Sequence, residues 1–204
     1  MANSLSRFEI HAISNGKLPM TQFIQKASMI EPHVDYIHLR EKQLSAKELM
    51  EAANGLKTIG IPFSKITIND RVDVAQAMGA EGVQLANHSL GADLVKRIFP
   101  ALRVGRSVHS VDEAVEAEYA GADYVLFGHV FPSNSKRDLP ARGLPALEKV
   151  VHSLKIPVIA IGGINPSNIA EVKKTGARGA AVMSGFWDSD DIEAVACAYR
   201  KGAM

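Results

Sequence analysis

The chain has 204 residues, of which 47% are hydrophobic and 22% are charged, and its formal net charge is +1. This composition is ordinary for a globular protein, and the lack of a basic block argues against nucleic acid or a membrane surface as a partner. Cys197 is the single cysteine, so an internal disulfide is excluded and a reducing compartment is expected. The sequence shows no signal-peptide core and no apolar run of about 18 residues. We therefore expect a cytoplasmic protein with one domain over residues 1–204.

Strand-like and helix-like patterns alternate eight times along the chain. Strands are expected at residues 8–14, 36–39, 65–69, 82–85, 103–107, 122–127, 157–161 and 179–183. Helices are expected at residues 21–30, 45–57, 72–78, 92–99, from 110, 144–153, from 168 and 190–200. Two of the helix starts, Ser45 with Glu48 and Ser110 with Glu113, have the spacing of a capping box.

The spacing and composition of these units predict the fold. Each strand and helix together take roughly 20 to 25 residues, as βα units require. The strands are continuously apolar, which is typical of a parallel sheet covered on both faces. Gly79, Gly121 and Gly176 end helices just before the next strand, where a left-handed cap lets the chain turn back. Eight such units favour the α/β class and a closed (β/α)₈ TIM barrel in a single domain.

In a TIM barrel the active site lies at the carboxyl ends of the strands, and phosphate is usually bound after strands seven and eight. Gly162 and Gly163 follow the seventh expected strand, and Met183, Ser184 and Gly185 end the eighth. Small residues let backbone amides approach an anion closely. Polar residues also end or follow other strands, namely Arg40, Lys42, Asn69, Gln84, Ser107 and His109. Together they predict a site for a small anionic substrate.

His129 is the candidate for proton transfer. It stands directly after the apolar strand at 122–127, where the chain leaves the core, and an unperturbed imidazole titrates near neutral pH. A purely structural histidine is the competing interpretation. His109 also follows a strand, but the N-cap expected at Ser110 would turn it toward the helix start. His11 and His38 lie in or near strands and are expected to be packed or hydrogen-bonded in the core.

Several segments resemble the thiamin-phosphate-synthase-like family over nearly the whole chain. They are Leu39–Lys42, Ile68–Arg71 with Asp73, Gly121–Tyr124, Phe131–Pro132, Ala160–Asn165 and Val182–Gly185. The resemblance implies a synthase that joins a pyrimidine diphosphate to a thiazole phosphate with magnesium held by two aspartates. Asp70 matches the first aspartate, but Ser89 stands where the second would fall, and serine is a poor replacement for a carboxylate that binds a hard cation. His129 stands where the synthase has proline.

Two further segments, 105–110 and 124–131, resemble the TenI-type thiazole tautomerases of the same family. That resemblance implies a metal-free and cofactor-free isomerase that aromatises a dihydrothiazole carboxylate phosphate. His129 would move the proton from the ring carbon to the exocyclic carbon. The glycine amides would hold the phosphate, Ser107 and Asn69 the carboxylate or ring, and Arg40 and Lys42 would neutralise anionic charge.

Two alternatives stay open. The loop 131–136 has the hydroxyl groups and the lysine typical of diphosphate binding in a synthase, so a magnesium-dependent transferase is the second interpretation. A catalytically silent binder of thiazole phosphate is the third. The sequence leaves both a monomer and a homo-oligomer open.

Overall fold

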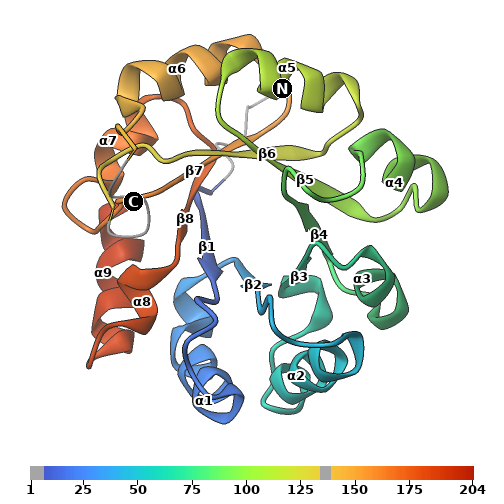
Figure 1. The fold of residues 1–204 in the computed structure, drawn as a ribbon. Helices are drawn as coiled ribbons and strands as arrows, with labels where there is room; N and C mark the ends of the chain where they lie inside the picture. Colours follow the sequence, from blue (N-terminus) through green and yellow to red (C-terminus); the bar gives the residue numbers. More distant parts are fainter. Residues whose placement is uncertain (1–6, 134–138) are drawn as a thin grey trace, which may run out of the picture.

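The computed structural model describes residues 7–133 and 139–204. Eight parallel strands close into a barrel in the order of the chain, and helices surround it (Figure 1). The strands are β1 (Glu9–Ile13), β2 (Tyr36–Leu39), β3 (Ile66–Asn69), β4 (Gly82–Leu85), β5 (Arg103–Val108), β6 (Tyr124–Gly128), β7 (Val158–Ile161) and β8 (Gly179–Val182). The helices are α1 (Met20–Ile30), α2 (Ala46–Thr58), α3 (Val72–Met78), α4 (Ala92–Ile98), α5 (Val111–Tyr119), α6 (Gly143–Ser153), α7 (Ile169–Lys174), α8 (Ser184–Trp187) and α9 (Ile192–Gly202). Two short 3-10 turns are η1 (Glu31–His33) and η2 (Phe63–Lys65).

The expected (β/α)₈ barrel is confirmed, with two local differences. The short helix α8 was not expected from the sequence; it follows β8 directly, and the indole Nε1 of Trp187 donates to the Ile13 carbonyl at 2.6 Å. The capping box at Ser45 is complete. At Ser110 only half of it forms, because the Glu113 carboxylate accepts from the amide of His109 instead of that of Ser110. In each case a tertiary contact outweighs the local pattern.

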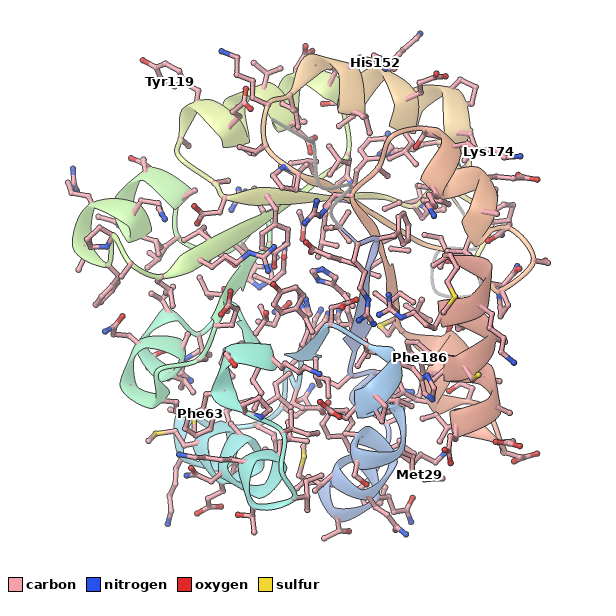
Figure 2. All side chains as sticks on the ribbon, turned by 180° about the vertical axis from the view of Figure 1, so that it is seen from behind. Met29, Phe63, Tyr119, His152, Lys174 and Phe186 are labelled. Atoms are coloured by element: carbon pink, nitrogen blue, oxygen red, sulfur yellow. The ribbon has the colours of Figure 1, made fainter. Side chains whose placement is uncertain are left out.

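The two faces of each strand bury different kinds of side chain. Residues such as Ile10, Ile37 and Ile68 point outward and pack against the helices in one continuous apolar core. The alternate residues point into the barrel, where a small apolar cluster around Ile159 and Leu126 shares the space with polar side chains. Figure 2 shows side-chain nitrogen and oxygen atoms gathered inside the ring of strands. The barrel interior is therefore a packed and partly polar core.

A buried hydrogen-bonded chain runs through this interior. Nε2 of His11 lies 3.1 Å from the Glu9 carboxylate, and its Nδ1 lies 2.9 Å from Nε2 of His38. Glu9 also contacts Arg178 at 2.9 Å and Arg103 at 3.5 Å. His11 and His38 are 0% and 1% exposed, so the expectation of core histidines is confirmed. No helix of the described residues is both long and apolar enough to span a bilayer.

Candidate active site at the carboxyl ends of the strands

The glycine turn after β7 approaches the loop after β6 very closely. Gly162 and Gly163 have φ angles of 100° and 66°, values that L-residues other than glycine rarely adopt. A Cβ atom on Gly162 would lie 2.3 Å from Cβ of His129, and one on Gly163 would lie 2.7 Å from Cβ of Phe131. Asn168, the N-cap residue of α7, donates from Nδ2 to the Gly163 carbonyl at 3.1 Å and so holds the turn in place. The turn and the candidate histidine thus form one packed unit.

A second amide-rich turn lies after β8. Ser184 and Gly185 begin α8, so their amides have no acceptor within the helix. No hydrogen bond between described residues uses these two amides or that of Gly163. A Cβ on Gly185 would come within 2.4 Å of the Tyr199 hydroxyl, which itself donates to the Ile164 carbonyl at 2.8 Å. Burial raises the pKa of Tyr199 to about 12, so this hydroxyl stays a neutral donor. These turns present the backbone donors that a phosphate group requires.

The contact between Gly162 and His129 supports a first prediction. We expect Gly162→Ala to lower the free energy of unfolding by about 2–4 kcal/mol, because the substitution combines an unfavourable φ with a steric overlap. Gly60→Ala is the matched control, since Gly60 has a φ of 98° but no atom within 4 Å of the added methyl group. Chemical denaturation of both variants separates backbone strain from the overlap. Equal destabilisation by the two substitutions would contradict the close packing against His129.

The His129 side chain is buried and hydrogen-bonded to the backbone. The side chain is 5% exposed, and Nε2 lies 3.1 Å from the Leu139 carbonyl oxygen. A carbonyl oxygen only accepts, so Nε2 carries hydrogen and Nδ1 has the lone pair of the neutral ring. The peptide bond between Gly128 and His129 is cis. The backbone carbonyl of His129 accepts from the amide of Arg142 at 3.0 Å, which fixes the return of the loop.

His109 lies beside the end of β6, but its ring does not have the orientation expected from the sequence. Ser110 does cap α5, with its hydroxyl 3.1 Å from the Glu113 amide, but the His109 ring turns away from the helix start. Its Nδ1 lies 2.8 Å from the Gly128 carbonyl oxygen at the end of β6. The Arg142 guanidinium donates to the same oxygen at 3.0 Å. The predicted orientation of His109 was therefore wrong, and two histidines meet at one peptide unit.

The remaining predicted polar residues lie at different depths. Gln84 is 2% exposed and donates from Nε2 to the Ser107 hydroxyl at 3.1 Å, so it lies behind Ser107 and does not reach the surface as a ligand would. Asn69 and Ser107 are half-buried at the ends of β3 and β5. Met183 is half-buried and packs against the apolar cluster inside the barrel. Ser107 and Asn69 are thus partly exposed at the strand ends, whereas Gln84 is buried.

The two predicted cationic residues follow β2. Arg40 is half-buried, and its backbone amide donates to the Ser14 hydroxyl at 2.8 Å. Lys42 is exposed. In the closed barrel, β1 lies between β2 and β8, the strand that the second turn follows.

The loop after β3 lies where the synthase resemblance implies a magnesium site with two carboxylates. Asp70 has a positive φ of 66°, and its Oδ1 accepts from the Ser89 hydroxyl at 2.5 Å. That hydroxyl in turn accepts from the Ala86 amide at 2.8 Å. Among the described residues no three His, Cys, Asp or Glu side chains are grouped to bind a metal ion. A single carboxylate bonded to a serine does not fit the expected donor set.

Arg142 and Asn168 belong to the site but were missed by sequence reasoning. Residue 142 lies 14 positions from the carbonyl that it contacts, and no periodic pattern connects the two. Asn168 was assigned only to the start of a helix, and its contact with the glycine turn depends on the fold of the loop. The lysine-containing part of the predicted diphosphate loop, Asn134–Lys136, lies outside the described residues.

Comparisons with known proteins find relatives of one family. A family model described as thiamine monophosphate synthase matches residues 10–186. The thiamine-phosphate synthase of Pyrococcus furiosus is 38% identical over 201 residues, which are 98% of this chain and 96% of that protein. That of Clostridium botulinum is 40% identical over 166 residues, 80% of this chain and 81% of that protein.

Solved structures also include a relative with a similar fold. A thiamine phosphate pyrophosphorylase from Pyrococcus furiosus has a TM-score of 0.84 at 36% identity, with 96% of this chain and 95% of that chain covered. A 3-hexulose-6-phosphate synthase has a TM-score of 0.74 at 19% identity, with 94% and 98% covered. The second likeness concerns the fold alone.

Proposed function

The chain belongs to the thiamine monophosphate synthase family, and we propose that it is an enzyme of thiamin biosynthesis that binds a thiazole phosphate at the barrel mouth. Phosphate binding is supported by the amides of Gly163, Ser184 and Gly185, which form no hydrogen bond with the described residues and follow the two strand ends where this fold binds anions. This small molecule is the partner that the site fits, and a cytoplasmic location remains part of the proposal.

The reaction that this chain's own residues support best is the tautomerisation of a dihydrothiazole carboxylate phosphate to the aromatic thiazole. One observation carries this choice: the Ser89 hydroxyl donates to the Asp70 carboxylate where a synthase would need a second carboxylate. His129 supplies the alternative chemistry. Its ring is fixed by the Leu139 carbonyl so that Nδ1 is the proton acceptor.

The steps follow from this arrangement. The phosphate on the glycine turns fixes one end of the substrate, and Gly162 brings that turn against His129. Neutral His129 removes the proton from the ring carbon that bears the carboxylate, and a proton is then returned to the exocyclic carbon. Aromatisation makes the reaction downhill, so positioned acid–base catalysis is sufficient, and it typically contributes about 10²–10⁴-fold. Ser107, which accepts a hydrogen bond from Gln84, would hydrogen-bond the carboxylate.

A transferase is the second candidate, and the names of the relatives favour it over the isomerase. The two proteins from Pyrococcus furiosus and Clostridium botulinum are called thiamine-phosphate synthases, and the solved relative is called a pyrophosphorylase. Such an enzyme would join a pyrimidine diphosphate to the thiazole phosphate. Asp70 is the one residue of the expected magnesium pair that this chain retains.

An ultraviolet time course distinguishes these functions. Purified protein is mixed with the dihydrothiazole carboxylate phosphate in buffer that contains a chelator. We expect protein-dependent formation of the aromatic thiazole. If none forms, and the same protein condenses pyrimidine diphosphate with thiazole phosphate once magnesium is added, the transferase is the correct function. Tight binding of thiazole phosphate without turnover in either assay would identify a catalytically silent binder.

Ser89→Asp tests the metal argument separately. We expect this variant to unfold at a lower temperature than the wild type in chelator, because two adjacent carboxylates repel each other. Millimolar magnesium should raise its melting temperature again, since a bound cation stabilises the folded state. Ser89→Asn, which adds no charge, is the control. A wild-type melting temperature that rises with magnesium as much as that of Ser89→Asp would contradict the argument.

A further inference from the structure

We propose that His109 is a second catalytic residue of this site, and that it returns the proton that His129 removes. The inference rests on the tautomerase function proposed above and assigns the second half of its proton transfer. It starts from one contact that the sequence did not predict: the His109 ring lies on the carbonyl of Gly128, the residue directly before His129.

The hydrogen bonds determine which nitrogen of each ring is available. Nδ1 of His109 donates to the Gly128 carbonyl, so its exchangeable position is Nε2. Nε2 of His129 donates to the Leu139 carbonyl, so its exchangeable position is Nδ1. No hydrogen bond between described residues uses either of these exchangeable nitrogens. Both rings are thus oriented by backbone carbonyls and keep one nitrogen for chemistry.

The position of His109 agrees with contact to a substrate. It lies just after the end of β5, and its ring is hydrogen-bonded to the last residue of the neighbouring strand β6, so it lies at the carboxyl ends of the strands. Ser107 is the group assigned to the carboxylate, which is attached to the carbon that loses its proton. His109 is half-buried, whereas His129 is nearly inaccessible. Water can therefore reprotonate His109 between turnovers.

Two charged groups hold His109 in place. The Glu113 carboxylate accepts from its backbone amide at 2.7 Å and adds negative charge nearby. The Arg142 guanidinium shares the Gly128 carbonyl with the ring and adds positive charge. The first contact fixes the backbone of residue 109, and the second fixes the carbonyl to which its ring is hydrogen-bonded.

Protons and electrons balance in this transfer. Neutral His129 takes the proton from the ring carbon, and the electron pair of the broken C–H bond moves into the conjugated system. Protonated His109 gives the proton on Nε2 to the exocyclic carbon, which completes the aromatic ring. His129 then carries one extra proton and His109 lacks one. When the product leaves, exchange with water restores both residues without any further reactant.

A substrate deuterated at the ring carbon tests the proposal in ordinary water. Two separate carriers predict that the exocyclic group of the product contains hydrogen from water and little of the substrate deuterium, as measured by NMR. Substantial transfer of the deuterium to the exocyclic carbon by the wild type would show a single carrier and overturn the proposal. Failure of the wild type to form any aromatic product would instead overturn the tautomerase function itself.

Two substitutions separate catalysis from positioning. His109→Asn retains an amide donor near Nδ1 that can bond the Gly128 carbonyl, and His109→Gln retains a group near Nε2. We expect both to lower kcat by about 10²-fold or more while affinity for the thiazole product is retained. Full activity of His109→Asn would mean that the ring only positions Gly128, and would overturn the proposal. His88→Asn, at an exposed histidine, is the control. If neither His109 variant folds, the wild-type isotope result still decides.

Discussion

His129→Gln should lower kcat of the tautomerisation by about 10²–10⁴-fold and leave binding of the aromatic thiazole phosphate unchanged. The glutamine side chain can place its amide near the position of the imidazole Nε2 and can still donate to the Leu139 carbonyl, which is 3.1 Å from Nε2 in the folded protein. The substitution therefore removes the proton carrier and retains the structural hydrogen bond. Since His129 touches neither phosphate turn through a side-chain hydrogen bond, product affinity should not depend on it.

The measurement pairs turnover with binding on the same preparation. Initial rates come from the ultraviolet assay, and product affinity comes from calorimetric titration. His152→Gln is the matched control, because His152 lies on the exposed side of α6, as Figure 2 shows. We expect wild-type rates from the control. Near-normal turnover by His129→Gln would mean that the histidine is structural, which was the competing interpretation of the sequence.

The same variant also bears on the transferase. The resemblance to the synthases implies proline where this chain has His129, so a condensation reaction would not require an imidazole there. A transferase that retained its rate in His129→Gln, with magnesium present, would agree with the names of the relatives. If that variant instead loses a metal-independent reaction, this chain catalyses a different reaction from those relatives on the same fold.

The fold was largely predictable because it depends on patterns that repeat. Continuous apolar strands and capped helices recur eight times, and each βα unit buries the outward face of its strand against a helix, as Ile10 and Ile68 illustrate. The exception is α8, where four residues form a helix too short to have a pattern. Its position depends on the indole of Trp187, which reaches back to the carbonyl of Ile13 at the far end of the sequence.

The position of the candidate site in the barrel could be predicted from the sequence, but the contacts between its residues could not. Barrel topology brings strand ends together, so Gly162, Gly163 and His129 could be assigned to one region from their positions in the chain. Orientation is a different matter. The sequence indicates a helix cap at Ser110, but only the folded loop shows that the His109 ring prefers the Gly128 carbonyl. Burial could not be predicted either: Gln84 and its partner Ser107 are both polar residues near strand ends, but Gln84 is buried and Ser107 is half-buried.

The buried histidine pair inside the barrel should make the protein sensitive to mild acid. Burial lowers the pKa of His11, and it lowers that of His38 well below the usual range, where the charge of Arg103 acts in the same direction. Burial opposes ionisation of Glu9, but hydrogen bonds from His11 and Arg178 outweigh it and bring the pKa of Glu9 down to about 2. Burial therefore favours the neutral forms of the two imidazoles, while the hydrogen bonds to Glu9 favour its ionised form.

The direction of the pH effect follows from proton binding. Below pH about 6.5 the histidines of the unfolded chain take up protons while those of the folded chain stay neutral, so the unfolded state is favoured as the pH falls. Each histidine contributes up to about 1.4 kcal/mol per pH unit in this range, until the folded pair is itself protonated. Glu9 adds a second loss of stability between its unfolded pKa and about pH 2.

Denaturant unfolding between pH 5 and 8 measures this effect. We expect the wild type to lose stability steeply below pH about 6.5. The double variant His11→Gln and His38→Gln should be less stable at pH 8 but lose much less on acidification, because the glutamines keep hydrogen-bonding groups but do not titrate. If the double variant does not fold, His38→Gln alone should show about half the change in slope. A slope equal to that of the wild type would mean that His11 and His38 bind protons equally in the folded and unfolded chains, so that their burial does not cause the acid sensitivity.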